Sequence, residues 1–156
     1  MLYISHRGNL DRINREEENK PSYILNALEK NFDVEVDVWF VKGTFYLGHD
    51  NPEYKVNMKF IKTNRLWFHA KNVEAFHELL KLNVTCFWHQ NDDVTLTSNG
   101  FIWTYPGKQL TIKSICVLPE LNNIKKFNCA GICSDFILNY FKDQNYILLS
   151  SEIKPI

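Results

Sequence analysis

Short apolar runs alternate along the chain with polar or helical stretches. Strands are predicted where β-branched and aromatic residues gather, at Leu2–Ser5, Phe32–Val41, Thr44–Leu47, Leu66–Ala70, Thr85–Trp88, Phe101–Tyr105, Ile115–Leu118 and Gly131–Ser134. Helices are predicted where apolar residues recur at helical spacing, at Tyr23–Lys30, Val73–Leu82 and Phe136–Lys142. This alternation predicts an α/β fold with a largely parallel sheet.

The chain is short for the barrel version of such a fold. It has 156 residues, which suits a single domain over 1–156. An eight-fold (β/α) barrel typically takes about 250 residues. A barrel here would therefore be a trimmed TIM-type barrel with some crossover helices missing.

Composition narrows the classes of partner. Eighteen basic residues balance eighteen acidic ones, so the net charge gives no sign of binding nucleic acid or an anionic membrane. The N-terminal residues contain no apolar stretch long enough for a signal peptide or a membrane span, and the four cysteines lie in or beside apolar runs as small buried residues. We expect a cytoplasmic protein with reduced cysteines. Sheet edges left uncovered by missing helices could pair in a homodimer.

Two acidic residues occupy the predicted strand Phe32–Val41. Side chains alternate between the two faces of a strand, so Glu35 and Asp37 point the same way. Like charges on one face repel each other, and a hard divalent cation held between them would remove the repulsion. The simpler alternative is a half-exposed strand whose acids are in water.

Histidines and basic residues follow several predicted strands. His69 and Lys71 share a face at the end of one predicted strand. His6 and Arg7 follow a second predicted strand, and His49 follows a third. Histidine can exchange a proton near neutral pH, and an arginine fork suits phosphate oxygens. His89 follows a further strand and is a candidate ligand or substrate contact, the alternative being a loop histidine with no special role.

The order of these residues resembles the glycerophosphodiester phosphodiesterase family. That family opens with His-Arg-Gly, then Glu-Asn, then Glu-x-Asp, then His-Asp. The matching residues here are His6-Arg7-Gly8, Glu18-Asn19, Glu35-Val36-Asp37 and His49-Asp50. Near the other end, Gly131-Ile132-Cys133-Ser134-Asp135 is similar to the family's last strand.

The resemblance implies a role for each matching residue. His6 and His49 would share the roles of general acid and general base, in either order, and Glu35 and Asp37 would bind the metal. Substrate contacts would come from Arg7, Asn19, Lys71 and His89. The family carries Glu-x-Lys where this chain has His69-Ala70-Lys71. The expected cofactor is therefore a divalent ion, Mg²⁺ or Ca²⁺ by resemblance, with Mn²⁺ or Zn²⁺ open because His69 replaces a carboxylate.

The predicted function is that of a phosphoric diester hydrolase acting on a glycerophosphodiester-like or other small phosphodiester. Two alternatives stay open. One is a non-catalytic module that binds a phosphate ligand or a partner on the same fold. The other is a lyase that closes a cyclic phosphate.

Overall fold

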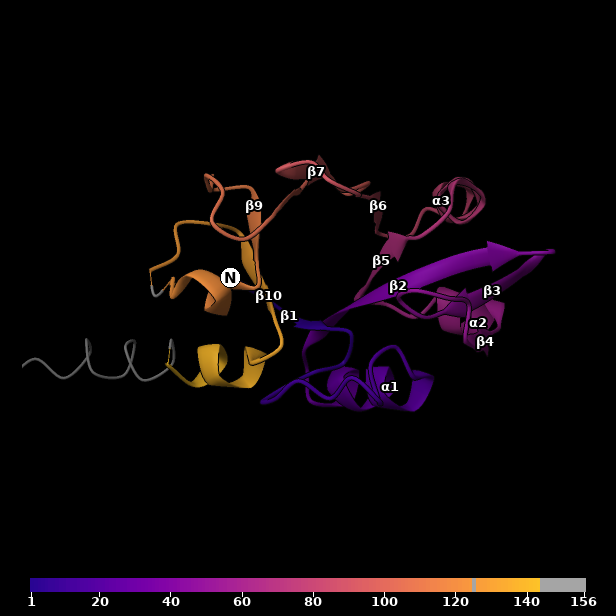
Figure 1. Ribbon diagram of the computed structural model, residues 1–156, viewed down its shortest axis with the longest axis horizontal. Helices are drawn as coiled ribbons and strands as arrows, with labels where there is room; N and C mark the ends of the chain where they lie inside the picture. The colour runs from indigo at the N-terminus through magenta and orange to yellow at the C-terminus, as the bar shows by residue number, and fades with distance from the viewer. Residues whose placement is uncertain (125, 144–156) are drawn as a thin grey trace, which may run out of the picture.

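The structure is a computed structural model that describes residues 1–124 and 126–143. Its centre is one curled, mixed sheet of ten strands with short helices beside it (Figure 1). The strands are β1 (Leu2–His6), β2 (Asp33–Val41), β3 (Thr44–Leu47), β4 (Tyr54–Val56), β5 (Leu66–Ala70), β6 (Cys86–Trp88), β7 (Val94–Leu96), β8 (Ile102–Thr104), β9 (Ser114–Val117) and β10 (Gly131–Ser134). The helices are α1 (Pro21–Glu29), α2 (Met58–Ile61), α3 (Val73–Lys81) and the 3₁₀ helix η1 (Pro119–Asn122), and residues 137–143 are also helical.

The strand order is β4-β3-β2-β1-β10-β9-β8-β7, and β5 pairs with β2 on one side and β6 on the other. β1, β2, β5, β6, β8, β9 and β10 are joined by parallel pairings. Three pairings are antiparallel, namely β2 with β3, β3 with β4, and β7 with β8. The carboxyl ends of the parallel strands therefore meet at one rim of the curl.

The prediction of a trimmed TIM-type barrel is wrong. The structure is a half-barrel in which strands dominate and helices are few and short. A helical crossover between parallel strands needs about a dozen residues or more. Only residues 105–113 connect β8 to β9, and they contain no helix. Short connections of this kind leave the strands to curl without the outer ring of helices that defines the barrel.

Helices that do form cover the outer face of the sheet. α1 begins with Pro21 in its first turn, where a missing N–H costs nothing, and Asn72 caps α3 by accepting from the Ala75 N–H at 3.2 Å. Both helices bury their apolar side against the outward valines of β2, which form a single core cluster with them. The predicted strands and helices are confirmed in position, whereas β4, α2, β7 and η1 were not predicted.

The inner face of the curl holds a second apolar cluster. It is built from buried residues of six strands, namely Ile4, Trp67, Phe87, Trp103, Ile115, Val117 and Cys133. Phe87 stacks on Trp103 with ring centroids 4.5 Å apart. Side chains alternate along each strand, so the next inward position toward the rim lies directly above this cluster. On five of the six strands these positions hold polar side chains, namely His6, His69, His89, Tyr105 and Asp135, which therefore lie over the apolar cluster.

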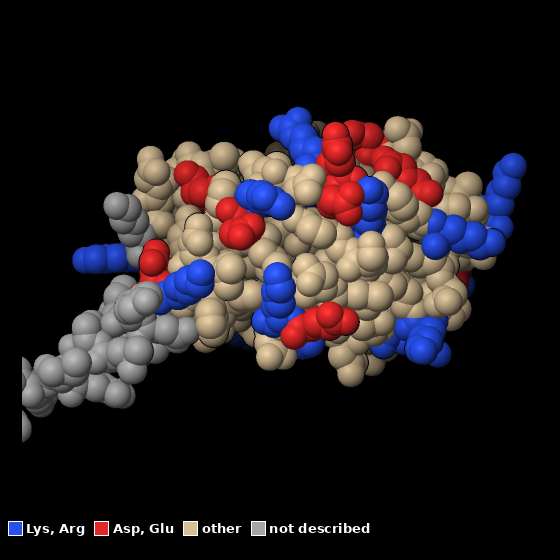
Figure 2. Space-filling view, turned by 90° about the horizontal axis from the view of Figure 1, so that it is seen from below, with Lys and Arg blue, Asp and Glu red and all other residues tan. Residues whose placement is uncertain are grey.

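The outer surface shows no large patch of one charge on the face drawn in Figure 2, where basic and acidic side chains are interspersed. Among the described residues, no helix combines the length and the apolar character that crossing a membrane requires.

Phe87→Ala tests the inner cluster. Phe87 is fully buried and stacks on both Trp103 and His69, so the cavity left behind should lower the free energy of unfolding by about 3–5 kcal/mol. Urea denaturation measures this change. Val94→Ala, at an exposed edge position, is the control and should cost less than about 1 kcal/mol. Equal losses in the two variants would contradict the assignment of this core.

Candidate metal and acid–base site

Glu35, Asp37 and His69 lie together on the inner face near the rim. β2 and β5 are parallel neighbours with Asp37 opposite His69, so the strand register alone brings these side chains together. His69 Nδ1 is 3.1 Å from Asp37 Oδ1 and 3.8 Å from Glu35 Oε1. One ligand atom from each of the three residues falls within 4.8 Å of the others, a separation that could hold a metal ion.

Both carboxylates of this cluster are buried. Glu35 is 2% exposed and Asp37 is 0% exposed. Within the described part of the chain, Glu35 Oε2 and Asp37 Oδ1 have no hydrogen-bond partner. A buried oxygen without a partner is costly, and a bound cation would satisfy it. The residues present therefore fit a divalent metal.

The hydrogen bonding of His69 supports the same conclusion. Its Nε2 lies 3.1 Å from the carbonyl oxygen of His89, which can only accept, so Nε2 carries the proton. In the neutral ring Nδ1 then points a lone pair at the carboxylate of Asp37. Two acceptors facing each other repel unless a proton or a metal ion lies between them. A carbonyl on the far nitrogen is a common way to orient a histidine ligand.

The two carboxylates have pKa values shifted in opposite directions. Burial, together with the charge of Asp37, raises the pKa of Glu35. Burial alone would also raise the pKa of Asp37, but the close approach of His69 and the positive charges of Arg7 and Lys71 outweigh it and lower that pKa. Asp37 is thus a charged carboxylate whose negative charge is balanced by its neighbours, whereas the charge of Glu35 is not balanced in this way.

Arg7 and Asn19, both predicted to contact substrate, hold Asp37 in place. Arg7 Nε is 2.8 Å from Asp37 Oδ2, an ion pair without the angle of a hydrogen bond. The Asn19 amide donates to Asp37 Oδ2 at 3.0 Å, and its oxygen accepts from the Asp37 backbone N–H at 2.9 Å. Lys71 Nζ is 3.4 Å from Asp37 Oδ1. Positive charge thus surrounds this carboxylate on several sides.

His6 is held by the carboxylate of Asp135, the residue that directly follows β10. β1 pairs with β10, and His6 Nδ1 lies 2.8 Å from Asp135 Oδ1. A carboxylate accepts, so Nδ1 carries the proton in neutral His6 and Nε2 has the lone pair, 3.9 Å from Glu35 Oε2. Although burial lowers the pKa of His6, the bond to Asp135 and the charge of Glu35 raise it overall.

His49 lies on the loop that follows β3. The preceding residue, Gly48, donates its N–H to the carbonyl of Asp37 at 3.1 Å, which fixes the start of the loop beside Asp37. An added Cβ at Gly48 would lie 2.2 Å from the Asn51 carbonyl oxygen, so only glycine fits there. His49 Nδ1 is 2.6 Å from Asp50 Oδ1, and its side chain is 43% exposed. The loop therefore presents a half-exposed imidazole at the rim.

Two cavities of about 460 and 470 Å³ adjoin at His49, which lines both. The first is also lined by His6, Arg7, Asn19 and Asp135. The second is lined by His69, Lys71, His89 and Tyr105. His6 and His49 thus face one space, with Glu35 and Asp37 buried beside it.

His89 is buried and stacks on Tyr105, with ring centroids 3.6 Å apart. Its Nε2 contacts the backbone carbonyl of Asp92. The stack closes one wall of the second cavity, so His89 contributes a ring face and a backbone carbonyl to the site. Burial, together with the charges of Glu35 and Asp37, raises the pKa of Tyr105, so this phenol keeps its proton.

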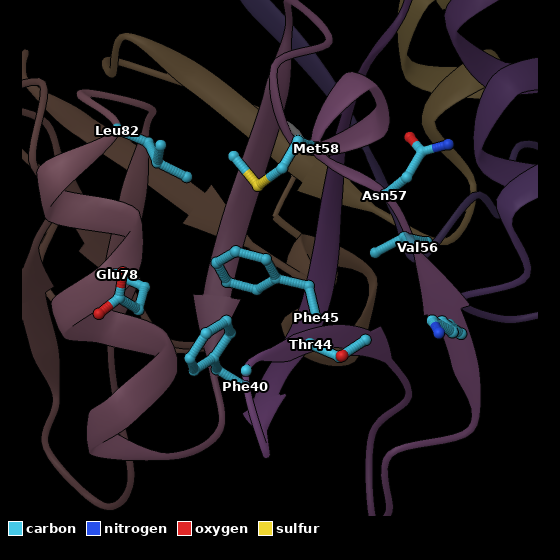
Figure 3. Close-up of a pocket in the computed structure, with 10 residues that line it drawn as sticks. Phe40, Thr44, Phe45, Val56, Asn57, Met58, Glu78 and Leu82 are labelled. Carbon is cyan, nitrogen blue, oxygen red and sulfur yellow. The ribbon is translucent and has the colours of Figure 1, made fainter.

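A third cavity, of about 640 Å³, lies between α3 and the segment from β3 to α2 (Figure 3). Its walls include the rings of Phe40 and Phe45 and the side chain of Met58. It shares no lining residue with the two cavities around His49. The titratable cluster therefore belongs to the rim and not to this apolar groove.

Sequence reasoning did not give a role to Asp135, Asn9 or Glu18, which hold His6 and Arg7. A signal for Asp135 was present, because it follows β10 in phase with the inward residue Cys133. Asn9 and Glu18 lie in the irregular segment between β1 and α1, where no periodicity indicates direction.

The chain matches no protein-family model, no curated protein and no solved structure. The resemblance to the glycerophosphodiester phosphodiesterases therefore stays a prediction.

Glu35→Gln tests whether the buried carboxylate of Glu35 binds a cation. Because the pKa of Glu35 is raised on folding, its contribution to stability is complete below the unfolded-state pKa and is lost as the pH rises through the folded-state pKa. In the presence of a chelator, wild-type protein should lose stability relative to Glu35→Gln between acidic and neutral pH. Differential scanning calorimetry measures the two melting temperatures.

Adding Mn²⁺ or Mg²⁺ should raise the melting temperature of the wild type and leave Glu35→Gln nearly unchanged. Parallel pH curves for the two proteins, or an equal response to metal, would show that Glu35 is not a ligand.

Proposed function

We propose that this protein is a metal-dependent phosphodiesterase that cleaves a small phosphodiester, with His6 and His49 as its acid–base pair. The observation that carries the proposal is the shared cavity of these two imidazoles beside a buried carboxylate pair. Catalytic sites commonly gather titratable groups with shifted pKa values in a cleft. The carboxyl ends of parallel strands are also where open α/β sheets bind ligands.

Glu35, Asp37 and His69 would hold the metal. A divalent ion at that position would act as a Lewis acid and neutralise negative charge on a phosphoryl oxygen. Lys71 would add positive charge from the second cavity, and Arg7 from the first. The basic groups thus surround the place where a phosphoryl group would sit.

The histidines would move the protons. The Nε2 lone pair of neutral His6 accepts a proton from the attacking oxygen, which forms a bond to phosphorus. The bond from phosphorus to the leaving oxygen breaks, and that oxygen takes a proton from protonated His49. Asp135 and Asp50 stabilise the positive imidazoles. His6 is suited to the role of base because its other nitrogen is already committed to Asp135.

A non-catalytic phosphate-binding module is the second candidate. One observation favours it. Arg7 is already engaged by two carboxylates, Asp37 and Glu18, which leaves less of its charge for catalysis. Binding of a phosphodiester without turnover under Mg²⁺, Ca²⁺, Mn²⁺ and Zn²⁺ would decide for the module.

Replacing either catalytic histidine with alanine should lower kcat on bis-para-nitrophenyl phosphate at least about a hundredfold, since acid–base catalysis contributes that much or more. The fifth histidine provides a matched control. His77 is exposed on α3, so His77→Ala should retain the wild-type rate. Near-normal rates in both His6→Ala and His49→Ala would refute the proposal.

Phosphorus NMR of the product separates a hydrolase from a lyase. Water as the attacking group yields a phosphomonoester, whereas a hydroxyl of the substrate itself yields a cyclic phosphodiester. We expect the monoester as the first product. A cyclic product that accumulates first would identify a lyase.

A further inference from the structure

The segment after β1 folds back beneath His6. Arg7 and Gly8 have positive φ angles of 53° and 93°, and the Asn9 N–H donates to the His6 carbonyl at 2.9 Å. Ser5 Oγ donates to the Asn9 carbonyl at 2.8 Å. A Cβ at Gly8 would lie 2.5 Å from Cδ1 of Tyr23, so glycine allows α1 to approach this turn. The turn therefore places the Asn9 side chain inside the protein, beside α1.

Asn9 is 0% exposed, yet its amide is fully satisfied. Its Nδ2 donates to Glu18 Oε1 at 3.0 Å and to Asp135 Oδ1 at 2.8 Å. Its Oδ1 accepts from the Asn14 N–H at 3.1 Å and from the Tyr23 hydroxyl at 3.3 Å. An amide offers two donors and two acceptor lone pairs, so every one is used.

The two carboxylates that Asn9 holds each orient a site residue. Asp135 Oδ1 accepts from both Asn9 and His6 Nδ1, and the second oxygen of Glu18 accepts from Arg7 Nη1 at 3.2 Å. The Asn9 amide thus bridges Asp135, which orients His6, and Glu18, which orients Arg7. Without the Asn9 donor, Asp135 and Glu18 would each lose one of the bonds that keep them in place.

We propose that Asn9 is a positioning residue, whose amide holds Asp135 and Glu18 where they orient His6 and Arg7 toward the cavity. The inference about rate depends on the proposed phosphodiesterase activity. The inference about orientation does not, because it concerns the proton on His6 and can be measured without substrate.

The first test is the tautomer of His6 in the wild-type protein, by long-range ¹H–¹⁵N correlation NMR on metal-free, ¹⁵N-labelled protein at alkaline pH. The His6 signals are assigned by their loss in His6→Gln. We expect a proton on Nδ1 and a bare Nε2, because Asp135 can only accept. A proton on Nε2 instead would overturn the proposal, and this result needs no variant of Asn9.

The second test compares Asn9→Ala with a control of similar burial. Thr97 is 2% exposed, and its hydroxyl accepts from the Phe101 N–H at 3.0 Å, remote from the site in sequence. Both Asn9→Ala and Thr97→Ala should lower stability. Only Asn9→Ala should change the His6 ¹⁵N shifts toward a mixture of the two tautomers. Unchanged His6 shifts in Asn9→Ala would overturn the proposal.

The kinetic test is a double-mutant cycle between Asn9→Ala and Asp135→Ala. Misplacing a catalytic group without removing it should lower kcat about tenfold or more, with KM changed less than about twofold. If Asn9 acts through Asp135, the double variant should be little slower than Asp135→Ala alone. Fully additive losses would contradict the coupling.

These results distinguish a failure of the proposed phosphodiesterase activity from a failure of the proposed role of Asn9. An inactive wild-type protein with the expected His6 tautomer refutes the phosphodiesterase and leaves the role of Asn9 standing. An active wild type whose Asn9→Ala variant keeps both kcat and the His6 shifts refutes the role of Asn9 alone.

Discussion

Two buried carboxylates on a single strand impose the main constraint on this molecule. Glu35 and Asp37 point into the curl from β2, where water cannot screen them. Burying charge costs free energy unless opposite charge or hydrogen bonds accompany it. The neighbours of Asp37 supply that compensation through Arg7, Lys71 and Asn19. Glu35 has less of this compensation, and its Oε2 atom has no hydrogen-bond partner among the described residues.

The curled sheet makes this arrangement geometrically available. Parallel strands β1, β2, β5 and β10 end at one rim, so inward positions at or just past their carboxyl ends contribute to the site. The apolar cluster beneath closes the inside of the curl and keeps the polar side chains at the rim. The pairing register of the strands positions the site residues more directly than the helices do. A half-barrel with few crossover helices still brings these residues together.

The sequence predicts which site residues share a strand face better than it predicts the fold around them. Alternation in β2 and β5 was enough to place Glu35 beside Asp37 and His69 beside Lys71 on shared faces. The fold class was wrong because motifs record the order of residues and not the course of the connections. Tyr54–Val56, which forms β4, is too short and polar to indicate a strand, yet it adds an antiparallel pairing. The bond between His6 and Asp135 joins residues 129 positions apart, so no local pattern could predict it.

The most direct measurement is anomalous scattering from crystals of this protein grown with Mn²⁺. We expect one strong manganese peak within bonding distance of carboxylate oxygens of Glu35 and Asp37 and of Nδ1 of His69. Crystals that contain Mn²⁺ but show no peak among these three side chains, or that show the ion bound only elsewhere, would contradict this expectation.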